Sequence, residues 1–306
     1  MKKLFVGVLC VALSLSVQGK EVNMTSPDGK YQFTLSDSGG QLHYSLTWNG
    51  KQTVKPSLLG INANVEWRDG VEIGTVDSSR KDTIWHPVYG ERSEIKDCYH
   101  AWKIVVNRQN GRDKLILDVR AYDEGIAFRY HFPGGQYLKI TDEYTEYTMP
   151  EGTKAYFTPK AQTPYSYLPL ENWPGESDRP LLLTLADGGY VCLAEAQVVD
   201  YVRTKFNVSP TKKNTIISAM YGPVEDIAPY STPWRVIMCA DKPGEILEHN
   251  DILLNLNPPC RIKDTSWIKP GKVMREVTLI TEGGKALVDF AVKRNLQYIH
   301  FDAGWY

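Results

Sequence analysis

The sequence predicts a mainly β protein, in which an antiparallel β-sandwich is followed by a single strand, helix and strand. Between Glu21 and about Arg261, short segments alternate polar and apolar residues and are separated by turn residues. No segment in this region repeats apolar residues at helical spacing over ten or more positions. After Pro258 and Pro259 the pattern changes to a strand, a loop, a helix and a second strand. This change predicts the beginning of an α/β unit.

Residues 1–19 are predicted to be a secretory signal peptide. Two lysines precede an unbroken apolar or small stretch from Leu4 to Val17, which is too short for a comfortable membrane span. Cys10 lies inside this stretch with further apolar residues after it, so lipid modification of this cysteine is the minor alternative. We expect cleavage near Gly19 or Lys20 and export of the mature protein.

Composition excludes several classes of partner and site. The 306 residues are 42% hydrophobic and carry a formal net charge of -1, with no basic block that would attract nucleic acid or an anionic membrane. The sequence contains no GxSxG, GxxxxGK or HExxH motif and no CxxC pair, so thiolate zinc is not expected. Cys192 and Cys239 lie in apolar strand-like runs and are predicted to be buried free thiols, with disulfides as the alternative.

Residues 20–262 are predicted to form the β domain. The stretch SPDGKYQFTLSDSGGQLHYSLTWNGK alternates at period two, and KLILDVRAYDEGIAFRYHFP repeats that pattern. Hairpin turns are predicted at Asp28-Gly29, Gly39-Gly40, Asn49-Gly50 and Asp123-Glu124-Gly125. The proline- and tyrosine-rich stretch from Thr158 to Pro180 is predicted to be a long irregular loop of the kind that carries recognition.

Residues 263–306 are predicted to begin an α/β barrel. SWIKPGKVMREVTL is interpreted as the first strand and its loop, and LQYIHFDAGW as the second strand. KALVDFAVKRN is interpreted as the helix, because Leu287, Phe290 and Ala291 fall on one face. A lone βαβ unit cannot cover both faces of its sheet, and an eightfold barrel needs about 250 residues. We therefore expect the chain to be the amino-terminal part of a longer protein.

Three residues near the carboxyl end are candidates for contact with a sugar. Asp302 follows an apolar strand, where barrel active sites lie and where a carboxylate can accept hydrogen bonds from hydroxyl groups. Trp305 offers a flat face to a pyranose ring. Lys269 is placed at the end of the first barrel strand. The alternative for Asp302 is that it caps the next helix.

Glu195 is the candidate metal ligand. It is embedded in the apolar run LAEAQVVDY, and a buried glutamate needs a partner such as a metal ion or an arginine. Calcium prefers carboxylate oxygens and is abundant outside the cytoplasm. The alternative is a structural salt bridge, and the residues alone leave both open.

Six segments together resemble glycoside hydrolase family 97. They occur in the order SPDGKYQFTLS, AYDEGIAFRYHFP, LAEAQVVDY, STPWRVIM, DTSWIKPGK and YIHFDAGWY, between Ser26 and Tyr306. The resemblance implies an exported enzyme of the Bacteroidetes type, periplasmic or on the surface of a Gram-negative cell. It also implies an amino-terminal β-supersandwich, a catalytic (β/α)8 barrel and a calcium ion in the active site.

The resemblance further implies roles for single residues. Glu195 matches a glutamate that helps to bind calcium, while Asp302, Trp305 and Lys269 match residues that contact the sugar. The segment PGKVMREVTL is more similar to the retaining α-galactosidase branch than to the tryptophan-rich loop of inverting α-glucosidases. The expected substrate is an α-linked oligosaccharide or galactoside.

The resemblance places the nucleophile and the acid/base carboxylate of a retaining enzyme beyond Tyr306, so the chain alone is expected to be inactive. The alternatives are an inverting α-glucosidase of the same family and a free-standing carbohydrate-binding β-sandwich. The oligomeric state stays open, with a monomer as the working expectation.

Overall fold

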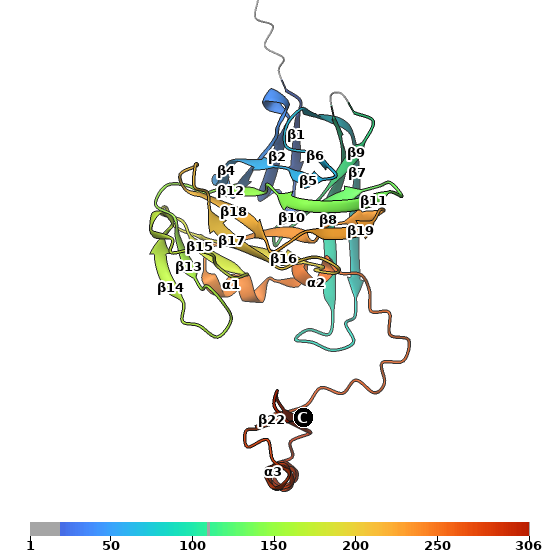
Figure 1. The fold of residues 1–306 in the computed structure, drawn as a ribbon, viewed down its shortest axis with the longest axis vertical. Coiled ribbons are helices and arrows are strands. Elements are labelled where there is room, and N and C mark those ends of the chain that lie inside the picture. Colours follow the sequence, from blue (N-terminus) through green and yellow to red (C-terminus); the bar gives the residue numbers. More distant parts are fainter. Residues whose placement is uncertain (1–18, 109–110, 306) are drawn as a thin grey trace, which may run out of the picture. The chain divides into compact units, whose positions relative to one another are not determined.

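The computed structural model describes residues 19–305 apart from 109–110, and it forms two compact units (Figure 1). The first unit holds the described residues up to Ile84 together with Lys96–Pro258, and the second holds Trp85–Ile95 and the described residues from Pro259 onward. The predicted signal peptide, apart from Gly19, lies outside the described residues. Within the described part of the chain, no helix has the length and apolar character needed to cross a membrane.

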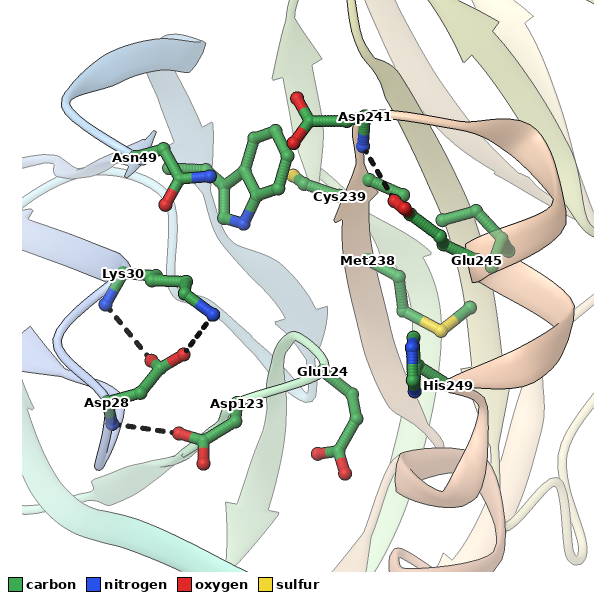
Figure 2. A pocket seen from close by; sticks show the side chains of 13 residues that line it. Asp28, Lys30, Asn49, Asp123, Glu124, Met238, Cys239, Asp241, Glu245 and His249 are labelled. Carbon is green, nitrogen blue, oxygen red and sulfur yellow. Dashed lines mark hydrogen bonds and ion pairs between the residues drawn. The ribbon is translucent and has the colours of Figure 1, made fainter.

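A seven-stranded antiparallel sheet contains the amino-terminal hairpins. Its strands, in spatial order, are β1 (Glu21–Thr25), β2 (Tyr31–Ser36), β3 (Leu42–Trp48), β4 (Lys51–Leu59), β12 (Glu146–Thr148), β18 (Thr215–Met220) and β17 (Thr204–Val208). The predicted turn at Asn49-Gly50 is confirmed, since both residues have positive φ, as a tight hairpin turn requires. Three turns, at Asp28, Asn49 and Asp123, surround one cavity (Figure 2).

The largest sheet has ten strands. Its order is β14 (Ser166–Pro169), β13 (Lys154–Phe157), β15 (Leu181–Thr184), β16 (Tyr190–Ala196), β21 (Trp234–Ala240), β10 (Ile126–Phe132), β9 (Lys114–Tyr122), β8 (Ile95–Arg108) and β7 (Val71–Trp85), and β20 (Tyr230–Ser231) pairs with β10. A smaller sheet orders β19 (Val224–Ile227), β11 (Tyr137–Glu143), β5 (Ile61–Ala63) and β6 (Val65–Glu66). The prediction of a mainly β fold is confirmed.

The predicted irregular loop from Thr158 to Pro180 is only partly irregular. It contains β14 and a short 3-10 helix, Leu170–Asn172, and β14 forms the edge of the largest sheet. Tyr167 of β14 lies opposite Tyr156 of β13, and their rings stack with centroids 4.7 Å apart. Proline is tolerated on an edge strand, so the proline-rich composition does not prevent pairing.

The main core packs the sheets against one another through aromatic side chains. Phe33 and Tyr44 of the seven-stranded sheet both contact Phe128 of the ten-stranded sheet, at centroid distances of 6.0 and 5.3 Å. All three side chains are fully buried or nearly so. Burial of this apolar surface between two sheets is the main source of stability in a sandwich.

A second core covers the opposite face of the ten-stranded sheet. Two short helices, α1 (Pro243–Glu248) and α2 (Asp251–Asn255), lie on this side, and Ile252 packs there with Cys192 and Trp234. Because both faces of β21 are covered, all seven of its residues are buried. The prediction of buried free thiols is confirmed for Cys192 and Cys239, and burial raises the pKa of each thiol to about 12.

The second unit contains one βαβ unit. The strands β22 (Val273–Glu276) and β23 (Tyr298–Phe301) pair in parallel, and α3 (Thr281–Lys293) connects them. The helix begins four residues before the predicted Lys285 and includes Gly283 and Gly284. A β-carbon at Gly284 would lie 2.9 Å from the ring of Phe301, so the glycine allows the helix to approach the strand.

Candidate functional site

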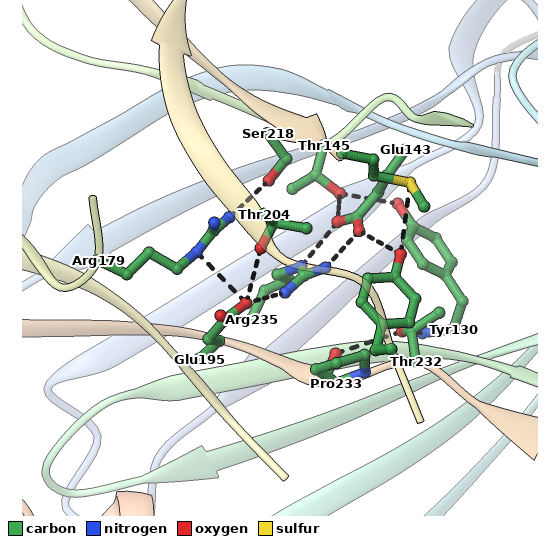
Figure 3. Close-up of polar contacts among 12 residues, drawn as sticks. Tyr130, Glu143, Thr145, Arg179, Glu195, Thr204, Ser218, Thr232, Pro233 and Arg235 are labelled. Carbon is green, nitrogen blue, oxygen red and sulfur yellow. Dashed lines mark hydrogen bonds and ion pairs between the residues drawn. The ribbon is translucent and has the colours of Figure 1, made fainter. Parts of the chain in front are cut away.

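The candidate site of the first unit is a buried cluster of charged side chains around Arg235 (Figure 3). Arg235 lies on β21 and its side chain is 1% exposed. The guanidinium binds Glu143 with two nitrogens, Nε to Oε1 at 2.7 Å and Nη2 to Oε2. The third nitrogen, Nη1, donates to Oε2 of Glu195 at 2.6 Å. One arginine thus holds two carboxylates, an arrangement that adds geometric specificity to the charge attraction.

The sheet register brings these residues together. Glu195 of β16 lies directly opposite Arg235 in the antiparallel pair, so the two side chains share one face of the sheet. Glu143 ends β11 in a different sheet. The sequence separation between Glu143 and Arg235 is 92 residues, so the packing of one sheet on another forms this contact.

Arg179 completes the charge balance. Its side chain is 8% exposed, its Nε lies 3.3 Å from Oε2 of Glu195, and its Nη2 donates to Ser218 at 3.2 Å. The guanidinium also packs 4.2 Å from the ring centroid of Phe206. Thr204 donates a further hydrogen bond to Oε2 of Glu195 at 3.1 Å. Two arginines therefore face two glutamates, which is the pairing that buried charges require.

Glu143 is held as a carboxylate. Burial by itself would raise its pKa, but the Arg235 guanidinium outweighs burial and keeps the pKa of Glu143 below its ordinary value. Thr145 donates to Oε1 at 2.7 Å and Tyr201 donates to Oε2 at 3.1 Å. Burial lowers the pKa of Arg179. The cluster is thus an ionic network in which Arg235 and Glu143 are fully paired, whereas Nε and Nη1 of Arg179 are buried without a hydrogen-bond partner among the described residues.

The residues described here do not by themselves fit a calcium ion. Calcium takes six to eight oxygen ligands, whereas Oε2 of Glu195 already faces two arginines and a threonine hydroxyl. Over residues 19–108 and 111–305, no group of three or more histidine, cysteine, aspartate or glutamate side chains is arranged to hold a metal. The salt bridge that the sequence left open as the alternative for Glu195 is present.

Asp302 and Trp305 lie at the carboxyl end of the parallel strand pair in the second unit. Asp302 directly follows β23, its Oδ1 accepts the backbone N–H of Ala303 at 2.8 Å, and its Oδ2 lies 2.8 Å from Arg275. These two contacts lower the pKa of Asp302. Trp305 is 62% exposed. The strand end therefore carries an ionised carboxylate, Asp302, and, three residues later, an exposed indole, Trp305.

The predicted position of Lys269 is wrong. Lys269 precedes β22, which begins only at Val273, so it lies at the amino end of the strand pair, opposite to Asp302. Pro270 and Gly271 are residue types that disfavour a strand, and the strand that pairs with β23 begins only after them. Lys269 therefore does not join Asp302 and Trp305 in one group.

Glu276 is the residue that ends β22, and sequence reasoning did not single it out. It pairs with Phe301 in the parallel register and is 4% exposed. Its carboxylate accepts hydrogen bonds from the backbone N–H and the hydroxyl of Thr278, at 2.9 and 2.6 Å, and from the N–H of Leu279. Glu276 therefore shapes the loop after β22. Its position at the end of an alternating run was the signal that could have identified it.

Arg235 and its partners were also incompletely predicted. No pattern in the sequence connects Arg235 with Glu143 or with Arg179. The available signal was a charged residue inside the apolar run WRVIMCA, which implies a buried counter-ion. The sequence does not say where that counter-ion lies.

Comparison with sequence families gives one match, to the family described as Glycosyl-hydrolase 97 N-terminal, over residues 24–259. Over its whole length the chain is 26% identical to a retaining alpha-galactosidase of Bacteroides thetaiotaomicron, and it covers 53% of that protein. It is also 26% identical to a probable retaining alpha-galactosidase of Streptomyces bingchenggensis, over 92% of this chain and 45% of that protein. The chain spans about half the length of these curated relatives.

Solved structures share the fold. A glycoside hydrolase family 97 enzyme from Pseudoalteromonas sp. strain K8, in complex with panose, superposes with a TM-score of 0.84 at 24% identity, over 93% of this chain and 48% of that one. A beta-arabinopyranosidase superposes with a TM-score of 0.83 at 20% identity, over 93% of this chain and 51% of that one. Because the family match spans more than half of the residues, this chain belongs to glycoside hydrolase family 97, and the matched part is the family's amino-terminal region.

Proposed function

We propose that the protein to which this chain belongs hydrolyses terminal α-galactosides with retention of anomeric configuration. The observation that carries the proposal is the match of the whole chain to a relative named a retaining alpha-galactosidase. A second relative with the same activity in its name supports it. The proposed substrate is an α-linked oligosaccharide or a simpler galactoside, and the proposed location is outside the cytoplasm.

Within this chain, Asp302 and Trp305 are proposed to bind the sugar rather than to transfer protons. A retaining glycosidase needs one carboxyl group as nucleophile and a second, about 5 Å away, as acid and then base. A general acid needs a raised pKa, whereas the pKa of Asp302 is lowered by Ala303 and Arg275. Asp302 therefore suits a charged acceptor for a sugar hydroxyl. We propose that the two catalytic carboxylates lie outside this chain.

Calcium is a separate proposal. In the longer protein, Glu195 would supply one oxygen, Oε1, since Oε2 is held by Arg235, Arg179 and Thr204. Bound calcium would add a fixed positive charge at this place. We expect Glu195→Gln in the longer enzyme to weaken calcium binding, measured by calorimetry on the metal alone. Unchanged calcium affinity would remove Glu195 from the ligand set.

The hydrolytic proposal is tested by expressing the longer reading frame and assaying aryl α-galactoside and aryl α-glucoside side by side. We expect faster hydrolysis of the galactoside, with the α-anomer of the sugar appearing first in the NMR spectrum. First appearance of the β-anomer, together with preference for the glucoside, would instead support the inverting α-glucosidase. The 306-residue chain alone is expected to release no sugar.

A further inference from the structure

A cavity of about 430 Å³ lies in the first unit, where hairpin turns from both large sheets meet the start of α1 (Figure 2). Asp28 and Lys30 come from the β1–β2 turn, and Asp123 and Glu124 from the β9–β10 turn. The remaining wall is formed by Trp48 and Asn49 at the β3–β4 turn and by the segment from the end of β21 into α1. This cavity shares no residue with the cluster around Arg235.

The turns around the cavity are tied together by hydrogen bonds. The backbone N–H of Asp28 donates to Oδ1 of Asp123 at 2.9 Å, and Lys30 lies 3.0 Å from Oδ2 of Asp28. The buried hydroxyl of Tyr31 accepts the N–H of Cys239 at 2.7 Å and lies 3.2 Å from the carbonyl oxygen of Glu124. The cavity is thus formed before any ligand enters it, which reduces the entropy cost of binding.

Glu124 is the side chain that points to a ligand. It is half-buried, and within the described part of the chain its carboxylate receives a hydrogen bond from its own backbone N–H and from no other residue. Burial raises the pKa of Glu124 and that of Asp123. A half-buried carboxylate with a single local donor costs free energy that further hydrogen-bond donors from a ligand would offset.

The lining selects the chemistry of that ligand. Five carboxylates and one lysine line the cavity, so anions are repelled, and ionised carboxylates can only accept hydrogen bonds. Trp48 is partly buried, packs against Tyr31 at a centroid distance of 6.4 Å, and also lines the cavity. A molecule that donates several adjacent hydroxyl groups and presents an apolar C–H face satisfies both features.

We propose that this cavity binds a neutral pyranose, with Glu124 and Asp123 accepting its hydroxyl groups and Trp48 packing against its ring. The cavity volume is within the range typical of small-molecule sites. The proposal depends on the cavity and not on the proposed hydrolytic activity. The sugar-binding proposal can therefore fail while the α-galactosidase proposal stands. The α-galactosidase proposal can likewise fail while sugar binding in this cavity stands.

The test is calorimetric and NMR titration of the full 306-residue chain with methyl α-galactopyranoside and methyl α-glucopyranoside. We expect saturable binding that Glu124→Gln weakens by about tenfold, because the charged acceptor of a hydroxyl group is replaced by a neutral amide. Glu151→Gln, at an exposed residue paired with Lys213 away from the cavity, is the matched control and should bind like the original chain. Trp48→Ala should also weaken binding, but Glu124→Gln is the decisive variant because no hydrogen bond from another residue in the described part of the chain depends on the Glu124 carboxylate.

Four results would overturn the proposal. The first is the absence of saturable binding, and the second is equal affinity of Glu124→Gln and Glu151→Gln. The third is binding of glucosamine, which carries an ammonium group, without binding of either neutral glycoside. A loss of binding in Asp302→Asn with full binding in Glu124→Gln would assign the sugar to the strand ends instead.

Discussion

Arg235 illustrates how a charged residue can occupy a fully buried strand. Removing a guanidinium and a carboxylate from water is costly, and mutual attraction compensates only when the geometry is good and the remaining polar atoms are satisfied. Here Glu143 receives hydrogen bonds from Arg235, Thr145 and Tyr201. The contribution of this ion pair to stability is therefore best measured by replacing Arg235 while Glu143 stays buried.

We expect Arg235→Met to lower the free energy of unfolding by about 3–5 kcal/mol, because it leaves Glu143 buried without its counter-ion. Urea denaturation of the 306-residue chain would measure this. The matched control is Lys213→Met, which breaks the exposed pair with Glu151 and should change stability little. Similar small effects from both variants would show that the buried pair does not contribute as argued.

Glu143 also predicts how stability depends on pH. Its pKa in the folded chain lies below the ordinary value of 4.5, so its stabilising contribution is complete above about pH 4.5 and is lost as the pH falls through the lower folded value. Glu143→Gln removes this titration. The difference in unfolding free energy between the original chain and Glu143→Gln should therefore stay constant between about pH 7 and pH 4.5 and shrink as the pH falls further. A difference that is independent of pH would contradict the assignment.

At the scale of elements, α2 shows how a helix of five residues is held by packing rather than by its own hydrogen bonds. So short a helix is unstable alone in water. Ile252 is fully buried in the second core, while Leu254 is 47% exposed. Substituting Ile252 therefore tests how much the packing of α2 stabilises the chain. Substituting Leu254 changes a residue of the same helix that packs much less.

We expect Ile252→Ala to destabilise the chain by about 2–5 kcal/mol, because it leaves a cavity under the ten-stranded sheet. Leu254→Ala on the same helix should cost much less, since its side chain is half exposed. Thermal unfolding followed by circular dichroism would compare them. Equal effects would mean that α2 does not cover the sheet as described.

At the scale of the whole molecule, the two units differ in how much they bury. The first has two cores between and beside its large sheets, whereas the βαβ unit buries few side chains, among them Glu276 and Ala291. A two-stranded sheet with one helix is marginally stable by itself. No helix or strand lies between α2 and β22.

Limited proteolysis should therefore remove the segment after Ile262 rapidly and leave the β-sandwich intact. Mass spectrometry of a time course with a nonspecific protease would identify the surviving fragment. Urea at a concentration that unfolds the sandwich is the control, and under that condition both units should be degraded. Survival of the carboxyl-terminal segment under native conditions would show that it is better packed than its burial suggests.

The sequence by itself determined the mainly β class, the hairpin turns, the parallel βαβ pattern and the family, because each is expressed in local periodicity or in ordered short segments. It also identified Glu195 as a charge within an apolar run that needs a partner. Tertiary structure alone decided that Arg235 and Arg179 are partners of Glu195 and that Glu143 joins them, since those contacts join separate strands and sheets. It also decided that Lys269 precedes its strand and that three distant turns enclose one cavity. Such pairings depend on how sheets pack, and no local pattern in the chain specifies that packing.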